Sequence, residues 1–101
     1  MKLRWTRRAK DDLVDIGRFI ARDKREAARR WVRALRQQAR KAAELPGVGR
    51  KVPELMRDDI REVVFHGYRI VYKVQDDTVF VLTVFQGRRR LPRDLADEPE
   101  P

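Results

Sequence analysis

The chain has 101 residues, of which 42% are hydrophobic and 41% are charged, and its formal net charge is +9. A chain of this length supports one hydrophobic core, so we expect a single domain, and its apolar clusters exclude a wholly disordered chain. It contains no cysteine and one histidine, which excludes disulfides and thiolate zinc sites and leaves us expecting neither a metal nor a cofactor. No apolar run approaches the roughly 20 residues of a membrane span, and the basic start lacks the apolar core of a secretory signal, which favours a cytoplasmic location.

The positive charge is concentrated in one part of the chain. Residues 24–51 hold ten Lys/Arg and two Asp/Glu, whereas residues 52–86 hold four and six. More arginines follow Gly87, and an acidic tail over residues 94–101, which we expect to be frayed, comes after them. This balance favours a polyanion or an acidic protein as partner and says nothing about the fold. We therefore expect one domain over residues 1–93.

The first half of the chain predicts a strand and two helices. Over residues 2–6, apolar and charged residues alternate as in a strand. Thr6 can then cap a helix, and a break near residues 23–24 separates it from a longer second helix that ends at residues 46–47. The apolar stripe of the first helix consists of Ala9, Leu13, Ile16 and Ile20. The expected face of the second consists of Ala28, Trp31, Leu35, Gln38, Ala42 and Leu45. Two such helices with a very short link should form an antiparallel hairpin.

The second half predicts three strands. Residues 60–65, 68–75 and 78–85 are rich in Val, Ile, Tyr and Phe, and residues 66–67 and 76–77 between them have turn chemistry. We expect an antiparallel meander whose last strand, apolar on both faces, lies inside the sheet. The predicted fold is α+β, with an N-terminal strand and a helical hairpin packed on a small antiparallel sheet.

Four segments in this order resemble a known family. They read GRKVPEL at 49–55, IRE at 60–62, YRIVYKV at 68–74 and VFQGRR at 84–89. Together they resemble the RelE/ParE superfamily of toxins from type II toxin–antitoxin systems, and most closely its ParE-like branch. The resemblance covers roughly residues 2–93 and implies a toxin that a cognate antitoxin neutralises in a hetero-oligomeric complex.

The RelE-like branch provides an alternative function. There the resemblance implies a ribosome-dependent endoribonuclease of messenger RNA, which needs basic side chains around one phosphate. Arg69 and Arg89 match two positive positions of that branch. However, Ile60 and Glu62 replace two lysines, and Leu95 replaces a late tyrosine. Because arginines are poor proton shuttles near neutral pH, the nuclease is the less favoured alternative.

The ParE-like branch lacks that basic set and, as a family, acts by binding DNA gyrase. The resemblance then assigns no catalytic residue, and we expect target contacts from arginine, which forms forks with carboxylate or phosphate. The expected target-binding residues are Arg61, Arg69, Arg88 and Arg89. One departure is Gln86, which stands where many relatives have histidine. A third possibility is an inactive basic module that binds nucleic acid or protein.

Several of these residues also have plain structural interpretations. Arg69 could pair with Glu62 across the hairpin, and the arginines after Gly87 could be a solvated charge run. For the antitoxin, a helical hairpin over a small sheet should leave an apolar groove, and the net charge suits an acidic segment that orders on binding. The expected antitoxin-binding residues are Leu13, Ile16, Ile20, Trp31 and Leu35.

Overall fold

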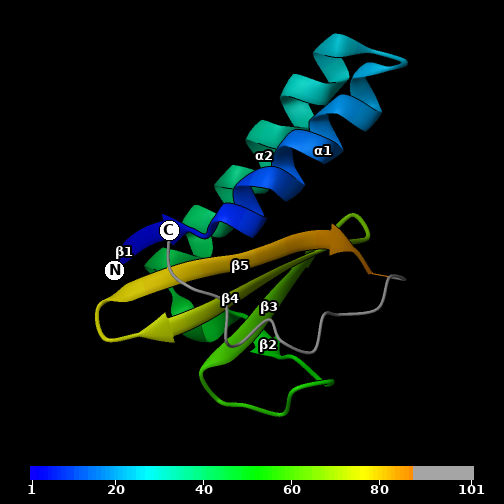
Figure 1. Cartoon of the computed structure of the whole chain (residues 1–101). Helices are drawn as coiled ribbons and strands as arrows, with labels where there is room; N and C mark the ends of the chain where they lie inside the picture. Colours follow the sequence, from blue (N-terminus) through cyan, green and yellow to red (C-terminus); the bar gives the residue numbers. More distant parts are fainter. Residues whose placement is uncertain (88–101) are drawn as a thin grey trace.

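A computed structural model describes residues 1–87 of the chain. The elements, in chain order, are β1 (Lys2–Trp5), α1 (Arg7–Ala21), α2 (Arg25–Glu44), the 3-10 turn η1 (Pro46–Val48), β2 (Arg50–Lys51), β3 (Ile60–Phe65), β4 (Tyr68–Gln75) and β5 (Thr78–Gln86). The two helices form a hairpin that rises from one side of the sheet (Figure 1). The expected domain boundary at residue 93 and the expected frayed tail lie outside the described residues.

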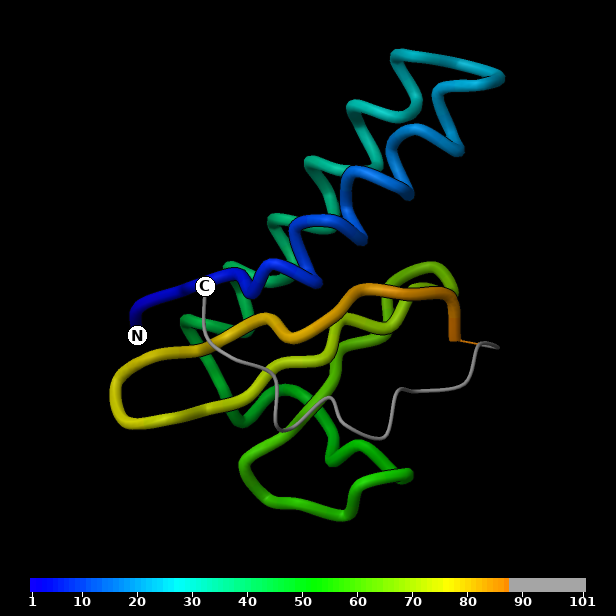
Figure 2. The backbone as a smooth tube through the Cα atoms, viewed as in Figure 1, coloured from blue at the N-terminus to red at the C-terminus, as the bar shows by residue number. Residues whose placement is uncertain are grey.

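The five strands form one mixed sheet in the order β1-β5-β4-β3-β2. The meander of β3, β4 and β5 and the interior place of β5 are confirmed, and the path can be followed in Figure 2. The N-terminal strand β1 joins this meander at one edge and runs parallel to β5, with Lys2 opposite Thr78, so the whole sheet is mixed. The strand β2 was not expected; its two residues pair antiparallel with β3.

Helix α1 begins at the predicted cap. The Thr6 Oγ1 accepts a hydrogen bond from the Ala9 amide at 3.2 Å and also lies 3.0 Å from the carbonyl oxygens of Val81 and Leu82. One side chain therefore starts the helix and fixes it against β5. Farther along, a Cβ built on Gly17 would lie 3.3 Å from Val32 Cγ2, so the absence of a side chain there lets α1 approach α2 closely.

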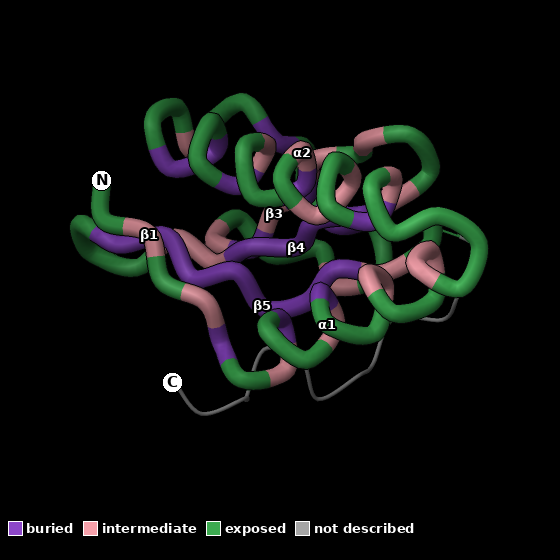
Figure 3. The backbone as a smooth tube through the Cα atoms, turned by 90° about the horizontal axis from the view of Figure 1, so that it is seen from above, coloured by how far each residue is buried: buried purple, intermediate pink, exposed green. Residues whose placement is uncertain are grey.

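The main core lies between the hairpin and the sheet. Its buried residues are Ala9, Leu13, Leu35, Ala39, Ile70, Val81 and Val84. A second buried cluster contains Val52, Ile60, Val71, Phe80 and Leu82. Ile70 and Val71 belong to different clusters, because successive side chains of β4 point to opposite faces of the sheet. Figure 3, seen from above, shows the resulting buried stretches of β4 and β5 in purple.

The predicted stripe of α2 extends one residue too far. Leu45 was expected on the buried face, but it is 67% exposed. The helix ends at Glu44, and Leu45 has left helical geometry with φ −133° and ψ 77°. Helical spacing no longer fixes the direction of a side chain beyond that point.

Candidate functional site

Arg69 lies on β4 and is almost completely buried, at 7% exposure. Its Nε donates to Glu62 Oε1 at 2.5 Å, and its two terminal nitrogens donate to the two carboxylate oxygens of Glu54 at 2.7 and 2.8 Å. The ring of Phe85 lies 5.1 Å from the guanidinium carbon. The pair with Glu62 that the sequence suggested is confirmed, and Glu54 is an additional partner.

The partners of Arg69 complete a cluster of four charged residues, Arg50, Glu54, Glu62 and Arg69, which we call the arginine–glutamate cluster. Glu62 is 1% exposed and also accepts from Arg50 Nε at 2.7 Å. The two hydrogen bonds from Arg69 lower the pKa of Glu54 to about 2. The same hydrogen bonds raise the pKa of Arg69 above its ordinary value. Two cations and two anions balance, so the cluster is neutral at physiological pH.

A surface cleft of about 680 Å³ borders this cluster. Its lining comes from the loop after β2 and from the ends of β3, β4 and β5, and consists of Arg50, Pro53, Glu54, Val64, His66, Gly67, Tyr68, Arg69, Gln86 and Gly87. His66 lies in the turn between β3 and β4, where its ring meets those of Trp31 and Phe65 edge-on, with centroids 5.4 and 4.5 Å away. The cleft thus combines aromatic walls with arginines that already have carboxylate partners.

Arg61 is half-buried on β3 and also has a partner. Its Nη1 donates to the carbonyl of Gly49 at 3.0 Å. The amide of the same glycine donates to the Tyr72 hydroxyl at 3.0 Å, which in turn donates to the Pro46 carbonyl at 2.6 Å. These contacts fix the chain between α2 and β2. Arg88 and Arg89, the other two expected target-binding residues, lie outside the described residues.

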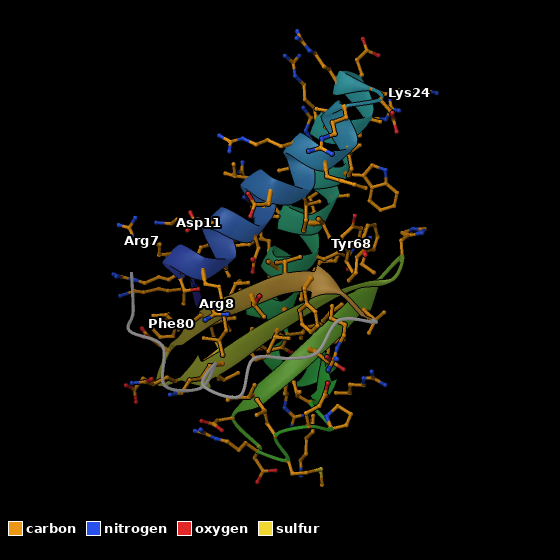
Figure 4. All side chains as sticks on the ribbon, turned by 45° about the vertical axis from the view of Figure 1, so that its right-hand side comes forward. Arg7, Arg8, Asp11, Lys24, Tyr68 and Phe80 are labelled. Atoms are coloured by element: carbon orange, nitrogen blue, oxygen red, sulfur yellow. The ribbon has the colours of Figure 1, made fainter. Side chains whose placement is uncertain are left out.

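A second groove, of about 480 Å³, runs between α1 and β5; we call it the α1–β5 groove. It is lined by Asp12, Asp15, Ile16, Arg18, Phe19, Arg22, Tyr68, Val84, Phe85 and Gln86. Asp12 ties the two elements together, because its Oδ2 accepts from the Thr83 hydroxyl and from the Val84 amide. Burial raises the pKa of this carboxyl. Tyr68, labelled in Figure 4, contributes from the first residue of β4.

The expected antitoxin-binding residues fall into two groups. Leu13 and Leu35 are buried in the core at 5% and 0% exposure, so they present little or no surface to a partner. Ile16, Ile20 and Trp31 are partly exposed, and Ile16 lines the α1–β5 groove. Sequence reasoning missed Phe19, which is 64% exposed in this groove. The only signal in the sequence that could have identified Phe19 was its position as a large aromatic residue off the predicted apolar stripe.

Residues 1–87 contain neither a metal-binding cluster nor a membrane-spanning helix. No group of three or more His, Asp or Glu side chains there is arranged to hold a metal ion. In the same part of the chain, neither helix is long and apolar enough to span a bilayer.

The arrangement of elements is shared with a solved toxin–antitoxin structure. A chain of the chromosomal ParDE system from P. aeruginosa superposes with a TM-score of 0.71 at 20% sequence identity, covering 85% of this chain and 95% of that one. This likeness places the molecule in the α+β fold of that structure. No curated protein matches the chain.

The family follows from the sequence match. The model of the ParE toxin of type II toxin–antitoxin systems matches residues 3–91. The chain belongs to this ParE toxin family, which confirms the resemblance seen in its four segments. Membership makes it the toxin of a type II toxin–antitoxin pair and implies an antitoxin as partner.

Proposed function

We propose that this ParE-family toxin acts by binding DNA gyrase and that its cognate antitoxin neutralises it through the α1–β5 groove. The observation that favours gyrase over RNA as the target is that Arg69 already has carboxylate partners. Its Nε and both terminal nitrogens already donate to Glu54 and Glu62. A site with this arrangement suits protein recognition better than phosphate cleavage.

The argument against RNA cleavage is electrostatic. A ribonuclease must stabilise extra negative charge on a phosphate and move protons near neutral pH. A phosphate beside Arg69 would have to displace Glu54 and would still lie near the buried carboxylate of Glu62. Arginine itself remains protonated, and its raised pKa makes it a still poorer proton donor.

Arg61 remains the best placed of the described arginines for direct contact. It is half-buried, and its one recorded hydrogen bond uses a single terminal nitrogen. Arg69 then has a supporting role, because it holds the loop that carries Glu54 against the sheet. We extend the proposal of target contact to Arg88 and Arg89 on the grounds of the sequence resemblance.

The proposal can be tested with purified components. The toxin is incubated with DNA gyrase, ATP and plasmid, and trapped cleavage complexes are measured after detergent and protease treatment. We expect cleaved plasmid to accumulate, and Arg61→Ala to reduce it severalfold. Arg4→Ala, which makes the same charge change at the opposite sheet edge, should behave like the wild type. Unaffected gyrase together with messenger RNA cleaved on ribosomes would instead establish the RelE-like alternative.

The α1–β5 groove is the proposed antitoxin site because it has the composition of a protein interface. Phe19, Phe85 and Tyr68 provide aromatic surface, which is enriched in the energetically important parts of such interfaces. The partly exposed Ile16 adds aliphatic surface beside them. A segment of the antitoxin that orders along this groove would cover the exposed ring of Phe19.

A further inference from the structure

A third hollow runs between the two helices. It shares Arg18 with the α1–β5 groove and no lining residue with the cleft beside Arg69. It consists of two adjoining depressions of about 610 and 530 Å³ that share Gly17, Val32 and Arg36. We call it the interhelical groove. Along the helices its floor is made of small residues and valine, because Gly17 lets the helices approach closely and Ala21 and Ala28 add little volume. At the sheet end it is also lined by Trp5 and Leu13.

The rim of this groove carries one sign of charge. Its lining contains six basic residues and no Asp or Glu, and the six are Lys10, Arg18, Arg25, Arg29, Arg33 and Arg36. Within residues 1–87, none of these six side chains makes a hydrogen bond or an ion pair, in contrast to those of Arg50 and Arg69. Their charge therefore remains available to a partner. In Figure 4, nitrogen-tipped side chains project from the hairpin between the labelled Arg7 and Lys24.

Four of the six form a regular row on α2. With about 100° of rotation per residue, Arg25, Arg29, Arg33 and Arg36 fall within an arc of roughly 80°. They extend over about 16 Å of helix axis at about 1.5 Å per residue. The two glutamates of α2, Glu26 and Glu44, fall outside this arc by the same geometry. A cation on each successive turn matches a partner whose negative charge also repeats regularly.

The composition of the groove favours nucleic acid over protein as that partner. The α1–β5 groove exposes Phe19 and is also lined by Tyr68 and Phe85, and aromatic residues are enriched at protein interfaces. In the interhelical groove, the one strongly exposed large apolar residue is Val14, at 49%. Unpaired basic side chains along a groove whose lining contains no Asp or Glu are instead typical of a surface that contacts phosphates.

We propose that the interhelical groove binds the sugar–phosphate backbone of duplex DNA. Arginine side chains reach separate phosphates as hydrogen-bonding forks, and nothing in the groove reads base edges, so binding is independent of sequence and weakens steeply with salt. Much of the excess charge of residues 24–51 serves this contact. The proposal goes beyond the gyrase target, because it concerns the affinity of the toxin itself for DNA.

The test compares two double variants of the full-length toxin that remove the same charge from the same helix. Arg29→Gln with Arg33→Gln changes the groove, whereas Arg30→Gln with Lys41→Gln changes exposed positions that line neither depression. Glutamine has nearly the helix propensity of arginine and lysine, and circular dichroism checks that both variants fold. Binding to a labelled duplex of about 20 base pairs is measured by anisotropy over a range of salt concentrations.

We expect the groove variant to lose about tenfold or more in affinity at low salt. Its slope of log K against log salt should fall by roughly 1.8, because each lost phosphate contact removes about 0.9. The control variant should keep nearly the wild-type slope.

Equal losses in both variants, or none in the groove variant, would overturn the proposal. So would intact DNA binding combined with lost antitoxin binding, which would make the groove a protein site. Since gyrase is absent from the assay, failure here is distinguishable from failure of the gyrase proposal.

Discussion

Gly49 occupies a position where a side chain does not fit. Its backbone, with φ −75° and ψ 153°, is open to any residue, but a Cβ there would lie 2.2 Å from the Tyr72 hydroxyl and 2.9 Å from the Glu62 carbonyl. We expect Gly49→Ala to lower the free energy of unfolding by about 1–3 kcal/mol, as overpacking does elsewhere. Urea denaturation followed by circular dichroism measures this. Gly47→Ala, with no atom within 4 Å of the new Cβ, should be nearly neutral.

Arg69 and Arg57 form carboxylate pairs of similar geometry at very different depths. The side chain of Arg69 is 9% exposed and its partner Glu62 is fully buried, whereas those of Arg57 and Asp59 are 43% and 36% exposed. Arg69→Ala leaves Glu62 with Arg50 alone, and we expect a loss of about 3 kcal/mol in unfolding free energy. Arg57→Ala should cost less than about 1 kcal/mol. Equal losses in urea denaturation would show that the buried cluster contributes no more than a surface pair.

At the scale of the elements, Thr6 joins α1 to β5. Its hydroxyl caps the helix and also lies against two carbonyls of the strand. Thr6→Ala removes both interactions, and we expect a loss of about 1–2 kcal/mol in unfolding free energy. Thr6→Ser, which keeps the hydroxyl, should recover most of that loss. A serine variant as unstable as the alanine variant would mean that the methyl group of Thr6 matters more than its cap.

Local sequence patterns predicted the helices and the meander because their determinants are local. The stripe of α1 and the turns at 66–67 and 76–77 all depend on near neighbours. The parallel pairing of β1 with β5 joins Lys2 to Thr78, and no local pattern carries that information. Strand β2 has two charged residues, and only its partner β3 makes it a strand.

The candidate site was partly predictable for the same reason. The pair of Arg69 and Glu62 joins adjacent strands of a hairpin, so its pattern could be read from the sequence. The pairing of Glu54 with Arg69 was not predicted, because Glu54 lies in a loop and only the tertiary fold brings it to Arg69. For the antitoxin, periodicity marked Leu13 as apolar, but it could not separate a buried residue from an exposed one such as Phe19.

At the scale of the whole molecule, the two faces of α1 are proposed to serve different partners. Phe19 lies in the α1–β5 groove and Val14 in the interhelical groove, and both are exposed. We expect Phe19→Ala to weaken antitoxin binding at least tenfold. Truncating an aromatic anchor that is buried at an interface often costs about 2 kcal/mol or more of binding free energy. Val14→Ala should leave that affinity nearly unchanged. Calorimetric titration of the toxin with its antitoxin measures both, and equal effects would argue against the α1–β5 groove as the docking site.

We propose that this ParE-family toxin stops growth through DNA gyrase. The most direct measurement is induced expression of the chain in bacteria that lack the antitoxin, with pulse labelling of DNA and protein synthesis at early times. We predict that DNA synthesis falls first and that the cells form filaments, while protein synthesis continues over the same interval. An immediate stop in protein synthesis with DNA synthesis intact would contradict the account and point to the ribosome as the target.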